Sequence, residues 1–215
     1  MTLEQIFPPF AVRISCGPVT LRALREQDAV RVAELAQAGI HAPDQRPFNF
    51  AWNLVDNQPW ESLRFYYRAW AACSPQDWNL LLAVERDHQM VGCQDLKATD
   101  FVTTRVIETG SWLGLAYQGQ GTGTLMRQAA VAFGLDHLGA SEMRSKAWSD
   151  NARSRRVSEK TGYQPNGYRV RARDGHPHRQ DQFVVTPQTF VRPPYPVVVS
   201  GLAELRNFLG LGPTD

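Results

Sequence analysis

The chain has 215 residues, of which 43% are hydrophobic and 20% are charged, so it is long enough for one domain with a sizeable core, with or without an extension. No apolar run approaches the ~20 residues of a membrane-spanning helix, and residues 1–10 lack the basic and apolar regions of a secretory signal, so we expect a cytoplasmic protein without a membrane segment. The formal net charge is +2, but the charge is unevenly distributed. Residues 1–107 carry 10 basic and 12 acidic side chains, whereas residues 108–215 carry 13 basic and 9 acidic ones. Either the second half attracts a polyanionic ligand, or the surface simply mixes charges of both signs.

Hydrophobic periodicity predicts strands and helices along most of the chain. Short apolar or alternating runs bounded by turn residues indicate strands, and apolar residues spaced three and four apart indicate helices. The predicted strands cover residues 19–24, 80–85, 90–98, 102–115, 143–148, 168–173 and 182–186, and the predicted helices cover residues 26–37, 60–73, 124–138 and 151–162. This order, β-α-α-β-β-β-α-β-α-β-β, is typical of a mixed α/β sheet flanked by helices.

Three segments fall outside this pattern. Residues 1–18 are interrupted by prolines and form a lead-in to a domain predicted over residues 19–186. Residues 40–59 hold several aromatic residues, including Phe50, and such a loop either lines a binding site or is anchored to the core by its rings. Residues 187–215 have no partner in the core pattern, so we expect this C-terminal extension to pack on the domain or on a second subunit of a homodimer.

The most informative stretch is a glycine-rich loop between a predicted strand and a predicted helix. It contains Gly119, Gly121 and Gly123, which allow positive φ angles and a close approach of the backbone to a ligand. The first turn of the following helix, from Thr124, offers unpaired N–H groups and the positive end of the helix dipole, which favour a phosphate. We interpret the loop as a pyrophosphate site; the alternative is a corner whose glycines only permit tight strand–helix packing.

The glycine spacing distinguishes between known phosphate-binding loops. A P-loop requires a lysine that this loop lacks, and a dinucleotide-binding fingerprint matches only in part. The pattern Gln/Arg-x-x-Gly-x-Gly/Ala matches fully through Gln118, Gly121 and Gly123, and the segment resembles the acyl-CoA-binding motif of the GNAT superfamily of N-acyltransferases. Residues 108–113 (Glu-Thr-Gly-Ser-Trp-Leu) and 151–163 (Asn-Ala-Arg-Ser-Arg-Arg-Val-Ser-Glu-Lys-Thr-Gly-Tyr) resemble the branch that contains the ribosomal-protein N-terminal acetyltransferases.

The resemblance covers roughly residues 19–186 and implies an α/β fold with a mixed, mostly antiparallel sheet of about seven strands. It implies that the fourth and fifth strands splay apart around the pantetheine arm of acyl-CoA, and that backbone groups of Leu113 and Leu115 bond this arm and the thioester carbonyl. It also implies that Asn151 faces the arm, although an ordinary helix N-cap is the alternative for this residue. The residues expected to hold the pyrophosphate are Gln118, Gly119, Gly121, Thr122, Gly123 and Thr124.

Acyl transfer requires a neutral amine, so a base beside the thioester is useful. Glu108, on the strand entering the site, is the candidate, although a glutamate there could equally be a salt-bridge partner. Many family members have a tyrosine at the position of Ser158, and this departure puts the usual acid in doubt. Ser154, one helical turn earlier, is therefore the candidate donor to the leaving thiolate. Ser111 and Trp112 are expected beside the incoming amine.

We therefore predict an N-acyltransferase that moves an acetyl, succinyl or other short acyl group from acyl-CoA to an amine of a small molecule or protein by direct attack. Cys16, Cys73 and Cys93 are expected to be reduced thiols outside the site, which disfavours an acyl-enzyme. A GNAT-like module that binds acyl-CoA as a sensor or scaffold is the alternative. The five scattered histidines form no metal-ligand pattern, and the arginine-rich residues 153–156 lack interleaved aromatic residues, so neither a metal nor nucleic acid is expected.

Overall fold

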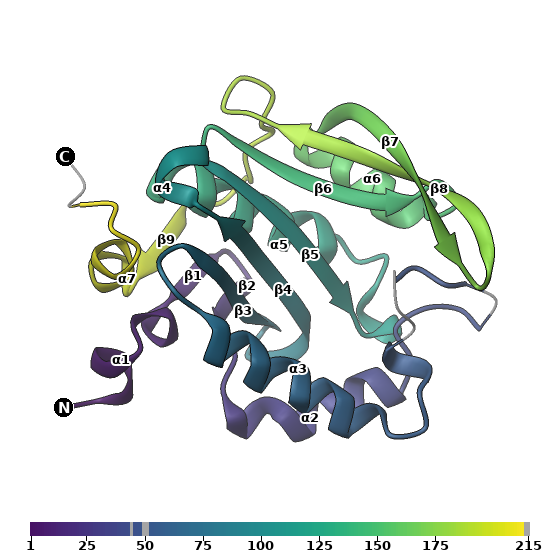
Figure 1. Cartoon of the computed structure of the whole chain (residues 1–215), viewed down its shortest axis with the longest axis horizontal. Helices are drawn as coiled ribbons and strands as arrows, with labels where there is room; N and C mark the ends of the chain where they lie inside the picture. The colour runs from purple at the N-terminus through teal and green to yellow at the C-terminus, as the bar shows by residue number, and fades with distance from the viewer. Residues whose placement is uncertain (44, 49–51, 213–215) are drawn as a thin grey trace.

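A computed structural model describes residues 1–43, 45–48 and 52–212; Phe50 of the aromatic segment lies outside the described residues. Its centre is a nine-stranded sheet in the spatial order β7-β8-β6-β5-β4-β3-β2-β1-β9 (Figure 1). The strands are β1 (Arg13–Cys16), β2 (Val19–Ala23), β3 (Asp77–Arg86), β4 (Gln89–Thr99), β5 (Val106–Leu113), β6 (Glu142–Trp148), β7 (Gln164–Arg173), β8 (His176–Val185) and β9 (Val197–Ser200). The helices are α1 (Leu3–Ile6), α2 (Ala29–Gln37), α3 (Gln58–Ala72), α4 (Phe101–Thr104), α5 (Thr122–Ala132), α6 (Ala152–Thr161) and α7 (Leu202–Phe208), with short 3₁₀ turns η1 (Pro8–Ala11), η2 (Glu26–Asp28), η3 (Trp52–Leu54) and η4 (Leu115–Tyr117) and a π turn, η5 (Phe133–His137).

Helices cover both faces of the sheet, which explains the continuous apolar run in β3. Leu80 and Leu82 belong to the core cluster that includes α5, whereas Leu81 and Ala83 pack in the cluster formed by α2 and α3. Figure 1 shows α2 and α3 in front of the sheet and α5 and α6 behind it. Each strand at the centre of the sheet therefore has an α5 face and an α2–α3 face.

The sheet is antiparallel except for the pair β5–β6, and this pair separates after a short contact. The two strands are in register over three residues, from Val106–Glu142 to Glu108–Arg144. Beyond this point β5 continues beside β4 and β6 continues beside β8, and Figure 1 shows the two strands diverging. The splay expected between the fourth and fifth predicted strands is therefore confirmed, with β5 and β6 as its two sides.

One predicted strand boundary is wrong because of an irregular turn. The strand expected over residues 102–115 begins only at Val106, because α4 forms a single helical turn before it, and it ends at Leu113. Asp100 and Arg105 flank this turn with φ angles of +48° and +53°. Aspartate adopts such angles more readily than most residues but arginine rarely does, so the residue types gave little indication of the turn.

The sheet has two strands more than the seven expected. β1 lies in the lead-in, β9 lies in the C-terminal extension, and the two pair antiparallel from Arg13–Ser200 to Cys16–Val197. After β9, helix α7 buries Leu205 in the core. The extension thus packs on the domain itself within this chain. The core pattern did not indicate its strand, because β1 and β9 are each four residues long and lie at opposite ends of the chain.

Candidate functional site

The edge of β5 that faces the splay presents backbone groups to a ligand. Gly114 N–H donates to a carbonyl of β4 (2.9 Å), so in this antiparallel ladder the backbone groups of Trp112 also face β4. Those of the alternate residues Ser111 and Leu113 face the other way, into the gap between β5 and β6. This is the edge at which the resemblance places the pantetheine arm.

The glycine loop leads from this edge into α5. Gly119 and Gly121 have φ angles of +76° and +82°, and Gly121 is the N-cap of α5. The Gly121 carbonyl accepts from the N–H groups of Thr124 and Leu125 (3.1 Å each), so the N–H of Thr124, expected to bind the pyrophosphate, is engaged within the helix start. The amides of Thr122 and Gly123, at the first two positions of α5, are left for a ligand. A β-carbon added at Gly123 would lie 3.7 Å from Leu113 Cδ1, so the first turn of α5 lies close to the Leu113 side chain at the end of β5.

A cavity of about 370 Å³ opens at this end of α5. Its lining includes Gly121, Thr122 and Thr124 of the predicted set, together with two cations, Arg86 and Lys160, that the sequence analysis did not single out. Arg86 donates to Thr122 Oγ1 (2.6 Å) and thereby anchors the loop to β3. Helix amides and two cations around a cavity of ligand size suit a polyphosphate.

Gln118 has a structural role within the loop. Its Nε2 donates to the carbonyl oxygens of Ile40 (2.8 Å) and Leu113 (2.9 Å), and its Oε1 accepts from Arg153 Nη1 (2.8 Å). These bonds tie the loop to β5, to α6 and to the segment after α2. The motif glutamine therefore shapes the loop, and its side chain is engaged within the protein rather than directed to the cavity.

Two other residues expected to contact the cofactor are also engaged in internal hydrogen bonds. The N–H of Leu115 donates to the carbonyl of Gly39 (2.8 Å), so it is not available to the pantetheine arm. Asn151 Oδ1 accepts from the N–H of Ser154 (3.1 Å), which makes Asn151 the N-cap of α6. Asn151 is thus a helix N-cap, which was the alternative stated for this residue.

A buried arginine spans the gap between β5 and β6. Arg127 of α5 is 4% exposed, and it donates to Ser111 Oγ on β5 (2.7 Å) and to Ser145 Oγ on β6 (3.0 Å). Both of its terminal nitrogens bond serines rather than a carboxylate, and its Nε is buried without a partner among the described residues. A buried charge that is not ion-paired is costly, so Arg127 is a candidate for binding an anionic ligand group.

The α2–α3 face of β5 carries the residues expected on the acceptor side. Glu108 Oε2 accepts from Lys146 Nζ at 3.2 Å, with both side chains partly exposed. The ring of Trp112 lies 5.6 Å from that of Trp52, so the aromatic segment does reach this face. Ser111, also expected beside the amine, instead points to Arg127 on the α5 face, because successive side chains of a strand alternate.

Asp95 is a second carboxyl group on this face, and the sequence analysis did not identify it. It lies opposite Gly110 in the β4–β5 pairing, and a β-carbon at Gly110 would be 2.5 Å from Asp95 Oδ1. Burial raises the pKa of Asp95, while the nearby charges of Arg127 and Lys146 act to lower it. The sequence feature that could have indicated such a residue is Gly110, since a glycine inside a strand often marks a close approach of another group.

Cys93 lies nearer the site than expected, because it pairs with Trp112 across β4 and β5. It is therefore next to a residue expected at the acceptor side, and the expectation that all three cysteines lie outside the site stays a prediction. Burial raises the pKa of the Cys93 thiol, so the thiol stays protonated at neutral pH. A protonated thiol is a poor nucleophile, so Cys93 is poorly suited to form an acyl-cysteine intermediate.

Helix α6 presents Ser154 and Ser158 on one face, since they are four residues apart. Ser154 is half-buried, whereas Ser158 is 0% exposed and its Oγ has no hydrogen-bond partner among the described residues. The packing of Val157 against the start of α5 brings this helix to the glycine loop. Both hydroxyls are thus candidates for donation to a leaving group.

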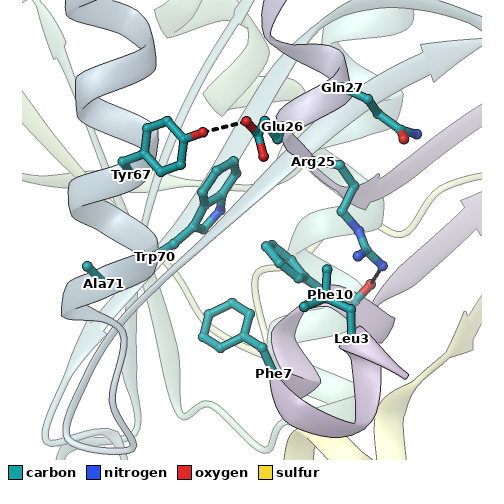
Figure 2. Close-up of a pocket in the computed structure, with 9 residues that line it drawn as sticks. All are labelled: Leu3, Phe7, Phe10, Arg25, Glu26, Gln27, Tyr67, Trp70 and Ala71. Carbon is teal, nitrogen blue, oxygen red and sulfur yellow. Dashed lines mark hydrogen bonds between the residues drawn. The ribbon is translucent and has the colours of Figure 1, made fainter. Parts of the chain in front are cut away.

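The rest of the described chain offers no second centre of comparable chemistry. A wider cavity of about 780 Å³ lies between the N-terminal segment and α3, and Figure 2 shows the rings of Phe7, Phe10 and Trp70 around it, with Tyr67 donating to Glu26. None of its lining residues belongs to β5, the glycine loop or α6. Among the described residues, no group of three or more His, Cys, Asp or Glu could hold a metal ion, and no helix is long and apolar enough to cross a bilayer.

Comparison with known proteins agrees with this geometry. The family model of the acetyltransferase (GNAT) domain matches residues 19–164. A solved structure of a probable acetyltransferase is 22% identical, with a TM-score of 0.65 over 79% of this chain and 93% of that one. RimJ of Mycobacterium smegmatis in complex with CoA-disulfide is 18% identical, with a TM-score of 0.66 over 84% of this chain and 88% of that one. RimL, a ribosomal L7/L12 α-N-protein acetyltransferase in complex with coenzyme A, is 16% identical, with a TM-score of 0.64 over 79% of this chain and 94% of that one. These structures share the fold, and the family match covers most of the chain, so the chain belongs to the acetyltransferase (GNAT) domain family and is an acyl-CoA-dependent N-acyltransferase.

Proposed function

We propose that the protein transfers an acetyl, succinyl or other short acyl group from acyl-CoA to a primary amine of a small molecule or protein in the cytoplasm. The observation that carries this proposal is the proximity of the first turn of α5, at Gly123, to Leu113 at the end of β5, whose N–H faces the gap. The cavity would hold the pyrophosphate, and the pantetheine arm would follow the edge of β5 to the start of the splay.

In the proposed reaction the amine nitrogen attacks the thioester carbonyl, a C–N bond forms, and the C–S bond breaks to release CoA. The N–H groups of Ser111 and Leu113 would bond the carbonyl oxygen as it gains negative charge. Glu108 would accept the proton that the amine loses, directly or through water. Ser154 would donate a hydrogen bond to the departing thiolate, which then takes a proton from solvent to become the thiol of free CoA.

Release of free CoA from acetyl-CoA or succinyl-CoA, measured with a thiol reagent against a panel of amines and N-terminal peptides, tests this proposal. Amine-dependent release with a matching acylated product is expected. Tight CoA binding without release for any amine would instead favour an acyl-CoA sensor or scaffold.

Arg127 favours an acyl group that ends in a carboxylate, because its guanidinium lies at the gap and, among the described residues, donates to two serine hydroxyls and to no carboxylate. Arg127→Met should lower kcat/KM for succinyl-CoA by roughly tenfold or more relative to acetyl-CoA, since the loss of a charged hydrogen-bond partner is costly. Steady-state kinetics with both donors measures this ratio, and Arg127→Lys should retain part of the preference. An equal loss for both donors would show that Arg127 only joins the two strands.

Substitution of Ser154 and Ser158 in α6 tests which of the two hydroxyls donates to the leaving thiolate. Ser154→Ala is expected to lower kcat by roughly tenfold, because one donor to developing charge is lost. Ser158→Ala is expected to have a smaller effect, because the buried hydroxyl lies one turn deeper in α6. If Ser158→Ala is the damaging change and Ser154→Ala is silent, then the unpartnered hydroxyl of Ser158 is the donor and the assignment to Ser154 is wrong.

A further inference from the structure

The cavity at the start of α5 has a wall that comes from outside the matched domain. Pro194 and Tyr195 line it together with residues of the loop and α5, and both lie beyond residues 19–164. They belong to the C-terminal extension, which runs from β8 to β9 at the far edge of the sheet (Figure 1). The cavity is therefore completed by a segment that the family pattern does not include.

The extension is held in this position by several contacts with α5 and α6. Gln128 Nε2 in α5 donates to the carbonyl of Val191 (3.0 Å), and the Val191 N–H donates to the carbonyl of Thr161 at the end of α6 (3.1 Å). Arg192 forms a two-pronged ion pair with Asp136 (2.6 and 3.0 Å). Together with the β9–β1 pairing, these contacts fix the backbone on both sides of Tyr195.

The Tyr195 ring is packed on one side and accessible on the other. A β-carbon at Gly17 would lie 2.5 Å from the ring, so the ring rests on the backbone of Gly17 and only a glycine leaves room for it. The residue is nevertheless 46% exposed. An immobilised aromatic ring at the mouth of a polyphosphate site is suited to stack on a planar base.

The same cavity has charge for a further phosphate. Arg86 already donates to Thr122 Oγ1 in the loop, whereas Lys160 is exposed at the end of α6 on the cavity wall. Coenzyme A carries, beyond its pyrophosphate, an adenine ring and a ribose 3′-phosphate. A stacking ring and an exposed ammonium group in one cavity match these two groups.

We propose that the C-terminal extension forms the adenosine subsite for the acyl donor, with Tyr195 stacking on the adenine and Lys160 binding the 3′-phosphate. This inference rests on the proposed acyl-CoA binding and extends it to residues outside the family domain. Donor affinity would consequently depend on the extension, although the extension carries none of the residues proposed for the chemistry.

Calorimetry with CoA, 3′-dephospho-CoA and 4′-phosphopantetheine tests the inference on the full chain. Tyr195→Ala should weaken CoA binding roughly tenfold and leave phosphopantetheine affinity unchanged, because only the base contact is lost. Tyr195→Phe, the matched control, should bind CoA as the wild type does. Lys160→Met should weaken CoA binding but not dephospho-CoA binding.

The outcomes separate this inference from the proposed function. If the wild type binds CoA and Tyr195→Ala binds it equally well, the adenosine subsite is not at Tyr195. A parallel loss of CoA and phosphopantetheine binding would also overturn the subsite, since it would show general damage to the cavity. Absence of CoA binding by the wild type would overturn the proposed function itself.

Discussion

Gly121→Val is expected to abolish measurable acyl-CoA binding while the domain stays folded. Gly121 has a φ angle of +82°, and no atom lies within 4 Å of the position of an added β-carbon, so the new side chain would project into the open cavity. There it would displace the pyrophosphate from the amides of α5. The backbone strain, of order 1–3 kcal/mol, is below the stability of a typical domain, ~5–15 kcal/mol. Calorimetry with CoA and thermal unfolding measure the two effects.

Two matched variants isolate the cause of this loss. Gly175 in the β7–β8 turn has a φ angle of +78° and open space around it, so Gly175→Val imposes a similar strain away from the cavity and should bind CoA normally. Gly123→Ala should be tolerated, because its β-carbon would meet Val157 Cγ2 at an ordinary 3.6 Å. Unchanged CoA affinity in folded Gly121→Val would remove the pyrophosphate site from this loop.

Glu108→Gln is expected to lower kcat by roughly 100-fold at neutral pH, with CoA affinity nearly unchanged. The amide keeps the shape of the side chain but cannot accept the proton from the amine. The loss should diminish as the pH rises, because a growing fraction of the acceptor is then already neutral. Profiles of kcat/KM against pH for the wild type and the variant measure this recovery, and Lys146→Met, which removes only the ion-pair partner, serves as the control.

Asp95 provides the competing assignment. Because burial raises its pKa, a catalytic Asp95 would place the acid limb of the pH profile above the usual aspartate range. Asp95→Asn is expected to lower kcat by less than tenfold if Glu108 is the base. A large loss that is recovered at high pH in Asp95→Asn, with Glu108→Gln unaffected, would instead make Asp95 the proton acceptor.

Local sequence patterns were sufficient for much of the domain. Hydrophobic periodicity predicted the strands and the longer helices between residues 19 and 186, although not α4, and the glycine spacing after β5 predicted the loop that opens α5. Both signals are local: side-chain period reports which face is buried, and glycine at Gly121 reports a φ angle that other residues avoid. The glycine motif and residues 108–113 and 151–163 carried the family resemblance, and the order of elements agreed with it.

Contacts between distant segments were decided only by the tertiary structure. The pairing of β1 with β9 and the bonds of Arg127 to two strands join residues whose neighbours in sequence do not indicate the partner. Gly110 indicated a close approach of some group, but the sequence did not identify that group as Asp95. The sequence likewise could not distinguish a ligand-binding side chain from one engaged internally, as at Gln118 and Asn151. The residue type determines which hydrogen bonds a side chain can form, but the fold determines which partners lie within reach. Side chains whose partners lie within the protein are structural, and only the others remain available to the substrate.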